Sequence, residues 1–398
     1  MRDLRREGRA RHPTHDAVPL GAARRAGAGD VLPSHHYLPS PSARIQELAR
    51  QNNQGDILND LSPSPAPASP ARRHLLGAAA GTALAVALPF AARAQATTKR
   101  IRLAHTAPLL HGWHLWAEQF KKGIEAKTGG KMQVQIFPNA QMGNERDTAQ
   151  AVRSGALEMG AIGVGMSSWV PELSITDAPF LWSSRAQAYA AFGGAFGAEM
   201  AKRCMEKGFV LTGWTDLGFR CITNNKRAVT SAKDLQGLKM RVPVSKAYVA
   251  MMQAMGASTV AVDLSELYLA LRQGVADGQD TPPSVVKSNK YYEVQKFVSK
   301  TDHVLTTGYT IANPKFFAGL KADEKAAFLA AATEADTYLR EYTQKDELEA
   351  YNFLKTQGMQ VTLDLDVESF RKACAPVIAR LPELFPPDLV KLAQATTV

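Results

Sequence analysis

The sequence of 398 residues contains few cysteines, and its three, Cys204, Cys221 and Cys374, follow no recognisable pattern. There is no CxxC pair and no Cys/His spacing of the zinc type, so the sequence predicts neither a disulfide framework nor a structural metal site. An odd number leaves at least one thiol free. Cys204 and Cys221 could pair in an oxidising compartment, but buried, unreactive thiols are the favoured interpretation.

Sequence motifs of the common enzyme classes are also missing. No GxSxG, P-loop or GxGxxG segment follows a predicted strand, which leaves nucleophilic hydrolysis and nucleotide binding without their usual marks. His105, His111 and His114 lie close together and Glu118 follows them, but no HExxH or comparable spacing accompanies them. We therefore expect His111 and His114 to be solvated histidines at a helix end, and we predict no enzymatic activity, no metal and no cofactor.

Positive charge is not gathered into a patch. The formal net charge is +10, but residues 1–96 contain 12 Arg, no Lys and 7 acidic residues, so residues 97–398 carry a net charge of only +5. A nucleic-acid partner would need clustered basic residues on the folded part, and none is predicted. The 45% content of hydrophobic residues, at this length, indicates a globular protein of two domains.

Only one long apolar run occurs, over residues 75–92, and it is rich in Ala and Gly rather than Leu and Ile. Two arginines precede it, and small residues at Ala94 and Ala96 form A-x-A sites after it. This order predicts a signal peptide over residues 72–96, cleaved near Ala94 or Ala96, and therefore a periplasmic protein. The paired arginines resemble a twin-arginine signal without its full consensus. A transmembrane helix is the alternative, which the composition and the A-x-A sites disfavour.

Residues 1–71 precede this signal and show no pattern of a folded core. They are rich in Arg, and residues 61–70 read LSPSPAPASP, with no helical or strand period sustained. Because a signal peptide belongs near an N-terminus, we expect translation to start further downstream. Residues 1–71 are accordingly predicted to be a disordered or mis-annotated N-terminal extension.

From residue 100 onward, short apolar strands alternate with amphipathic helices. Trp113, Trp116, Phe120 and Ile124 share one face of a helix predicted over residues 112–128. The predicted strands include residues 101–105, 131–138, 157–164, 209–214, 220–224, 238–242 and 258–262. The other predicted helices are residues 144–154, 247–255, 264–273 and 322–357. Such alternation indicates largely parallel sheets, with ligands beyond the carboxyl ends of the strands.

Two units of this kind predict an α/β protein with the two-lobed periplasmic-binding-protein (Venus-flytrap) fold, in which a ligand is buried between the lobes. The solute-binding part would span residues 97–398. Lobe I is predicted to cover about residues 97–220 plus part of the C-terminal half, and lobe II about residues 221–310. The helix over residues 322–357 is long enough to span both lobes.

Several short segments occur in the order and with the spacing of a known family. They are FPNAQMG at 137–143, GFR at 218–220, GLKMRVP at 237–243, SELYLAL at 265–271, VADGQ at 275–279 and YEVQK at 292–296. From about residue 100 to 360 the chain resembles the DctP-type solute-binding proteins of tripartite ATP-independent periplasmic (TRAP) transporters. The resemblance implies capture of a small organic acid anion and its delivery to small and large integral membrane subunits. A ligand-sensing module for a membrane receptor is the alternative, and a periplasmic enzyme is less favoured.

The resemblance places the carboxylate-binding arginine of the family at Arg241. The position suits that role, because Arg241 ends a predicted strand before Pro243 and its planar guanidinium can bond both oxygens of a carboxylate. Arg220 matches a second family arginine that either contacts the ligand or supports the site. The hypothesis is that a carboxylate pairs with Arg241 in an open form and that closure of the lobes completes the site.

Two predicted site positions depart from the family pattern. Thr281 stands where many members have Asn, and its single hydroxyl can form fewer bonds to a carboxylate. Gly163 stands where sialic-acid-binding relatives have an acidic side chain, so that ligand is not expected. His105, Trp214 and Leu264 complete the predicted site. The loops after the strands are mostly small or apolar, which favours a monocarboxylate with a hydrophobic body.

Overall fold

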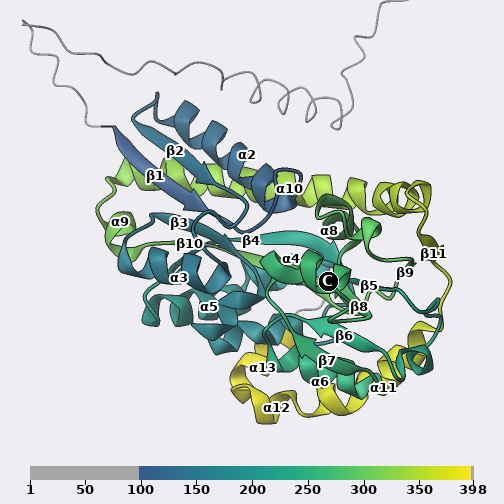
Figure 1. Cartoon of the computed structure of the whole chain (residues 1–398). Coiled ribbons are helices and arrows are strands. Elements are labelled where there is room, and N and C mark those ends of the chain that lie inside the picture. Colours follow the sequence, from purple (N-terminus) through teal and green to yellow (C-terminus); the bar gives the residue numbers. More distant parts are fainter. Residues whose placement is uncertain (1–97, 396–398) are drawn as a thin grey trace, which may run out of the picture. The chain divides into compact units, whose positions relative to one another are not determined.

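The computed structural model describes residues 98–395, so the predicted extension (1–71) and signal peptide (72–96) lie outside the described residues. Two β-sheets flanked by helices organise this part of the chain (Figure 1). The five-stranded sheet has the order β2-β1-β3-β10-β4 and consists of β1 (Lys99–Ala104), β2 (Met132–Phe137), β3 (Met159–Ile162), β4 (Val210–Phe219) and β10 (Leu305–Ala312). The six-stranded sheet has the order β11-β9-β5-β8-β6-β7 and consists of β5 (Cys221–Asn224), β6 (Lys239–Val242), β7 (Ser258–Ala261), β8 (Gly278–Thr281), β9 (Phe297–Ser299) and β11 (Gln360–Thr362).

Each sheet is the centre of one lobe, and we call them the first lobe (five-stranded sheet) and the second lobe (six-stranded sheet). The helices are α2 (Gly112–Lys127), α3 (Glu145–Ser154), α4 (Arg185–Gly193), α5 (Ala195–Glu206), α6 (Lys246–Ala254), α7 (Leu267–Arg272), α8 (Pro283–Ser288), α9 (Pro314–Ala318), α10 (Ala322–Thr356), α11 (Val367–Ala379), α12 (Leu381–Leu384) and α13 (Pro387–Gln394). Within residues 98–395, none of them has both the length and the apolar character needed to cross a bilayer.

Both sheets are mixed, which corrects the expectation of largely parallel sheets. Strand β1 pairs in parallel with β2 and β3, but β10 runs antiparallel to β3 and β4. In the six-stranded sheet, β5 likewise runs antiparallel to β8 and β9. The chain passes from β4 into β5 and returns from β9 into β10, and a returning strand enters its sheet from the opposite end. Strand β10 therefore belongs to the first lobe, although most of it falls within residues 221–310.

Helix α2 packs on the first lobe with the apolar face that its sequence predicts. Trp113, Trp116, Phe120 and Ile124 are all buried, and the rings of Trp116 and Phe120 stack with centroids 5.2 Å apart. Burial of one such side chain contributes about 2–3 kcal/mol to the free energy of unfolding. The helix begins after His111, whose side chain caps it by accepting a hydrogen bond from the backbone N–H of Trp113.

Helix α10 contributes to the cores of both lobes. It has 35 residues, which corresponds to a length of about 50 Å. Phe328 and Leu339 lie in the core of the first lobe, whereas Tyr351 and Leu354 lie in that of the second. The predicted long helix that spans both lobes is thereby confirmed (Figure 1).

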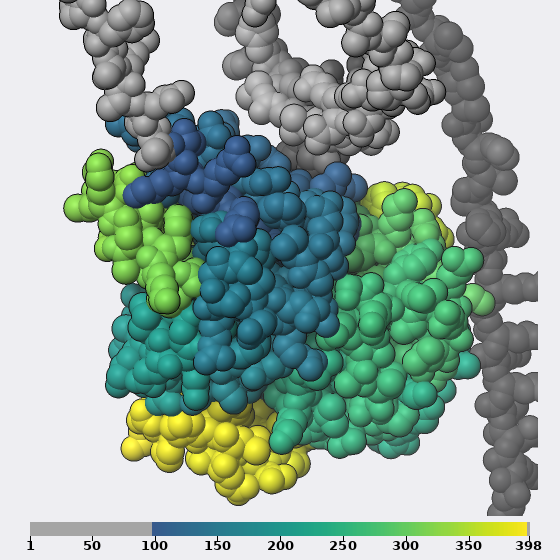
Figure 2. All heavy atoms as spheres, turned by 60° about the vertical axis from the view of Figure 1, so that its left-hand side comes forward, coloured from purple at the N-terminus to yellow at the C-terminus, as the bar shows by residue number. Residues whose placement is uncertain are grey.

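The C-terminal helices also connect the lobes. Phe370 and Cys374 of α11 lie in the core of the second lobe, whereas Leu389 and Val390 of α13 lie in that of the first. Figure 2 shows this yellow segment beneath the teal residues of the first lobe and against the green residues of the second. The two lobes are thus joined by the β4–β5 and β9–β10 connections, by α10 and by the C-terminal helices.

The three cysteines are free and buried. Cys204 lies in the core of the first lobe, whereas Cys221 and Cys374 lie in two cores of the second, so the alternative of a Cys204–Cys221 disulfide is wrong. Burial raises the pKa of Cys204 and of Cys374 to about 12, and it also raises that of Cys221. The thiolate, which is the reactive form, is therefore disfavoured at all three positions.

A buried carboxyl on α10 makes the stability of this packing depend on pH. Asp336 accepts a hydrogen bond from Trp116 Nε1 at 2.7 Å, and burial raises its pKa to about 7. The folded protein thus holds this proton more tightly than the unfolded chain, where the usual pKa is about 3.9. The contribution of Asp336 to the free energy of unfolding therefore keeps its full value below about pH 4 and decreases as the pH rises from there through 7.

We expect Asp336→Asn, which keeps the acceptor for Trp116, to remove this loss. Relative to wild type, the free energy of unfolding should rise by about 2–3 kcal/mol more at pH 8 than at pH 5. Urea unfolding at the two pH values measures the difference. Glu341→Gln alters an exposed carboxyl on the same helix and is the control; identical pH dependence of Asp336→Asn and wild type would contradict the expectation.

Candidate functional site

A cavity lies between the two lobes and is lined by residues of both. Counted with its opening to solvent, it contains about 630 Å³ of space. Five of the seven predicted site residues line it, namely Gly163 of the first lobe, Arg220 at the β4–β5 connection, and Arg241, Leu264 and Thr281 of the second lobe. Their contact with a ligand stays a prediction.

Arg241 is a buried cation without an acidic partner. It lies in β6 and is 2% exposed, and its Nε donates to the carbonyl of Val262 at 2.8 Å. Among residues 98–395, no carboxylate oxygen lies within 4 Å of its guanidinium nitrogens. Burial lowers the pKa of Arg241, and more distant acids offset this only in part. Because burying an unpaired charge is unfavourable, this geometry favours an anion in the cavity.

Arg220 also lines the cavity, but its charge is already paired inside the protein. Its Nε donates to Asp280 Oδ2 at 2.7 Å, its Nη2 donates to the Asp280 carbonyl, and its Nη1 donates to the Thr306 hydroxyl at 3.3 Å. The guanidinium also lies 4.6 Å from the ring centroid of Tyr248. Burial alone lowers the pKa of Arg220, but Asp280 and neighbouring groups raise it overall. These contacts indicate a supporting position beside Arg241.

The carboxylate that pairs with Arg220 belongs to a buried chain of polar groups. Asp280 lies in β8 with no exposed surface, and its Oδ2 is 3.2 Å from His303 Nε2. His303 Nδ1 lies 2.8 Å from the hydroxyl of Thr301. Asp280 reaches Arg220 because β5 and β8 pair antiparallel, with Cys221 opposite Thr281. The register of two strands thus fixes the neighbour of Arg220.

The two positions that depart from the family pattern line the cavity from different lobes. The Thr281 hydroxyl is buried and has no hydrogen-bond partner within the described part of the chain. A Cβ atom on Gly163 would lie 2.9 Å from the ring of Trp113 and 3.4 Å from a carboxylate oxygen of Glu145. The indole of Trp113 therefore takes the space that a side chain at residue 163 would need.

Two carboxylates line the cavity. Glu145 was not among the predicted lining residues, whereas Asp263 lies in the loop at 262–264 that was expected to line the site, without a role for its carboxylate. Glu145 begins α3, its Oε2 accepts from the Gly165 N–H at 2.7 Å, and burial raises its pKa. Asp263 follows β7, and its Oδ2 lies 3.4 Å from the amide nitrogen of Asn144, the cap of α3. The sequence did contain an indication that Glu145 could line the site. Asn144 and Glu145 begin a predicted helix that follows a predicted strand, and they therefore lie at the edge of the sheet where ligands bind. The expectation of a mostly small and apolar lining is corrected accordingly.

His105 and Trp214 are not among the residues that line the cavity. His105 is 1% exposed, with its Nε2 3.2 Å from His114 Nδ1, and Trp214 stacks on Phe192 in the core of the first lobe. His111 is also 1% exposed, so the expectation of a solvated histidine at the helix start is wrong for His111. Across residues 98–395, no group of three or more His, Cys, Asp or Glu side chains is placed to hold a metal ion.

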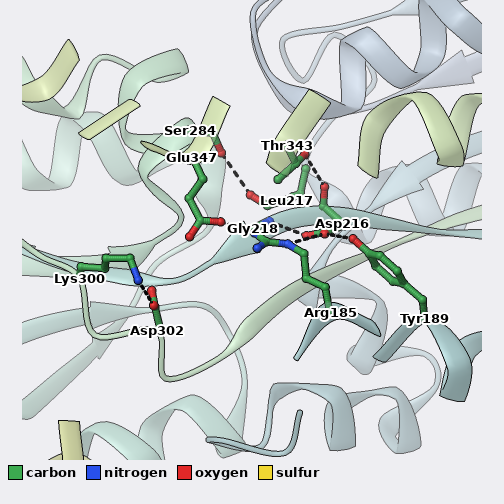
Figure 3. Close-up of polar contacts among 10 residues, drawn as sticks. All are labelled: Arg185, Tyr189, Asp216, Leu217, Gly218, Ser284, Lys300, Asp302, Thr343 and Glu347. Carbon is green, nitrogen blue, oxygen red and sulfur yellow. Dashed lines mark hydrogen bonds and ion pairs between the residues drawn. The ribbon is translucent and has the colours of Figure 1, made fainter. Parts of the chain in front are cut away.

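An ion network surrounds the end of β4 (Figure 3). Arg185 of α4 pairs with Asp216 of β4 at 3.0 Å and with Glu347 of α10. The Asp216 carboxylate also accepts hydrogen bonds from Tyr189 and, at 2.7 Å, from the Gly218 N–H. Gly218 has a φ of +102°, a conformation that favours glycine. The network therefore holds the end of β4 in a defined turn just before Arg220.

Hydrogen bonds to the backbone extend this network to two further helices. The Leu217 carbonyl accepts from Ser284 of α8 at 3.1 Å, and the Asp216 carbonyl accepts from Thr343 of α10 at 2.9 Å. Leu217 itself lines the cavity. The first lobe, the second lobe and α10 thus all contact the strand segment that forms this part of the wall.

Known proteins resemble this chain over most of its length. Residues 103–383 match the sequence profile of the bacterial extracellular solute-binding proteins, family 7 (DctP). A solute-binding protein of Verminephrobacter eiseniae is 36% identical over 324 residues, which are 81% of this chain and 95% of that protein.

Two solved structures have a similar fold. A TRAP periplasmic solute-binding protein from a Polaromonas species, bound to D-erythronate, is 32% identical with a TM-score of 0.73, and the match covers 75% of this chain and 99% of that one. A TRAP periplasmic solute-binding protein from Bordetella bronchispeptica, with density interpreted as pantoate, is 30% identical with a TM-score of 0.72, and the match covers 75% and 100% of the two chains.

Proposed function

Because the chain belongs to family 7 of the bacterial extracellular solute-binding proteins, the DctP family, we propose that it captures a small organic acid anion in the periplasm for a TRAP transporter. The membrane partners would be the small and large integral subunits of that transporter, to which the loaded protein delivers the anion. One relative of known structure is bound to D-erythronate and another has density interpreted as pantoate, and both compounds are carboxylates. The role requires binding and release but no catalytic step.

The observation that carries this proposal is the buried guanidinium of Arg241, which has no acidic partner among the described residues. A carboxylate in the cavity would accept two parallel hydrogen bonds from the guanidinium fork. The unpaired hydroxyl of Thr281 lines the same cavity and could donate a third. Closure of the lobes would exclude water and so strengthen the ion pair.

Export and lobe boundaries are part of the same proposal. The signal peptide over residues 72–96, cleaved near Ala94 or Ala96, would bring the protein to the periplasm. The lobes would move about the β4–β5 and β9–β10 connections, which lie near the proposed boundary at residue 220 and close to the end of the proposed second lobe at residue 310. Closure would then signal to the membrane subunits that the site is occupied.

Thermal unfolding with a panel of mono- and dicarboxylates tests the capture of an anion. A ligand that binds only the native state raises the melting temperature, with a gain of about 2.7 kcal/mol at 100 times its dissociation constant. We expect stabilisation by one group of carboxylates and none by the neutral amides of the same acids. Equal stabilisation by acid and amide, or a flat response to every acid, would refute the proposal.

A further inference from the structure

The imidazole of His111 supplies a hydrogen-bond donor that the carboxylate site leaves unused. Its Nδ1 accepts the Trp113 N–H at 3.1 Å, so that nitrogen carries no proton. Burial, and secondly His114, lowers the pKa of His111 to about 3, and the ring is therefore neutral near pH 7. A neutral imidazole without a proton on Nδ1 carries it on Nε2. The helix cap thus fixes Nε2–H as a donor.

This donor lacks a partner. His111 lines the cavity and is 1% exposed, and within residues 98–395 its Nε2 is a buried nitrogen with no hydrogen-bond partner. The neighbouring indole of Trp113 does not compete for the same acceptor, because its Nε1 donates to the Thr215 hydroxyl at 3.2 Å. Since a buried N–H without an acceptor is unfavourable, a molecule in the cavity is the natural source of that acceptor.

The charges of the cavity decide which acceptor fits. Arg241 and Thr281 occupy the second lobe and suit one carboxylate, whereas Glu145 and Asp263 also line the cavity and would repel a second one. A hydroxyl group suits both kinds of neighbour, because its oxygen can accept from an N–H while its hydrogen is donated to a carboxylate.

We propose that the ligand is a hydroxylated monocarboxylate and that His111 helps to select it by donating its Nε2–H to a hydroxyl oxygen of the ligand. Glu145 or Asp263 accepts a hydroxyl hydrogen, and Arg241 holds the carboxylate. This inference rests on the proposed function and specifies which class of organic acid the protein binds. It replaces the hydrophobic-bodied acid expected from the sequence, and it makes unsubstituted acids and dicarboxylates poor ligands.

Calorimetric titration of wild type and His111→Ser tests the inference. Serine keeps an oxygen that can cap α2, but it is too short to place a donor where Nε2 lies. The probes are D-erythronate, pantoate and galactonate as hydroxylated monocarboxylates, butanoate as an unsubstituted acid and succinate as a dicarboxylate. The tightest wild-type ligand should be a hydroxylated monocarboxylate at least tenfold stronger than butanoate, and His111→Ser should weaken it at least tenfold.

His114→Ser is the matched control, because it makes the same change in the first turn of α2, three residues after the cap, at a histidine that does not line the cavity. It should leave every affinity within twofold, and an equal loss in both variants would overturn the inference by tracing the effect to the helix start. A tightest ligand that is unsubstituted or a dicarboxylate would overturn it too, as would His111→Ser binding within twofold of wild type. If the inference about His111 is overturned but Arg241→Met still abolishes carboxylate binding, the proposed function survives. If no carboxylate binds to wild type, both the inference and the proposed function fail.

Discussion

Replacing Arg241 with methionine is expected to weaken carboxylate binding by about 100-fold or more, and to raise the free energy of unfolding of the ligand-free protein by about 1–3 kcal/mol. Binding falls because the ligand loses its charged partner. Stability rises because the folded state no longer holds a cation that is 2% exposed and has no acid within 4 Å among residues 98–395. Calorimetric titration and urea unfolding measure the two quantities.

Two further substitutions make this result specific. Arg241→Lys keeps the charge but loses the planar fork, so its affinity should fall by only about tenfold. Arg380→Met changes an exposed arginine paired with Glu383 and should alter neither quantity by more than about 0.5 kcal/mol. Unchanged affinity in Arg241→Met would mean that the carboxylate binds elsewhere. A joint loss of affinity and stability would mean that Arg241 mainly holds the fold.

Asp280→Asn is expected to lower the free energy of unfolding by about 3–5 kcal/mol. Asp280 is completely buried and compensates Arg220, which is 3% exposed, across a distance of 2.7 Å. Removing one partner of a buried ion pair leaves the other charge without compensation. Urea unfolding at pH 7 measures the loss, which is a large part of the usual stability of about 5–15 kcal/mol.

The double variant Arg220→Met/Asp280→Asn shows whether the loss of stability comes from the uncompensated charge of Arg220 or from disturbed packing around residue 280. It removes both charges and should regain at least half of the stability that Asp280→Asn loses. Asp302→Asn is the matched control, because Asp302 pairs with Lys300 at a half-exposed position and its loss should amount to less than about 1 kcal/mol. Equal losses in Asp280→Asn and Asp302→Asn would contradict the buried-pair argument.

The helices that matter most for the fold could be predicted because their apolar spacing is local. The face of α2 that includes Trp116 and Phe120, and the whole of α10, follow from a 3.6-residue period. Strand direction is different, because it depends on where the chain crosses between sheets, and β10 enters the first lobe on its way back. Strand β11 has only three residues, too few for any period to emerge.

Sequence reasoning could propose single site residues, but not the meeting of two distant ones. The family resemblance placed the carboxylate-binding arginine at Arg241, and its position before Pro243 suits that role, but its lack of a counter-ion is a property of the packed protein. The pairing of Arg220 with Asp280 depends on the register of β5 against β8.

The burial of His111 was likewise hidden, because residues far away in the sequence cover the start of α2. A Cβ atom on Gly112 would lie 2.8 Å from Leu217 of β4 and 3.1 Å from Leu339 of α10. Those two elements pack against the residue that follows His111, and the sequence around residue 111 contains no sign of them.

The burial of the three cysteines makes the proposed closure of the lobes directly measurable with dyes. Maleimides react with accessible thiolates, and Cys204, Cys221 and Cys374 are buried thiols with raised pKa values, so they should stay unlabelled. New cysteines in place of Leu110 in the first lobe and Leu269 in the second, 51% and 54% exposed, would then take a fluorophore pair without removal of the native ones. Energy transfer between the dyes would report how far the lobes move when an acid is added.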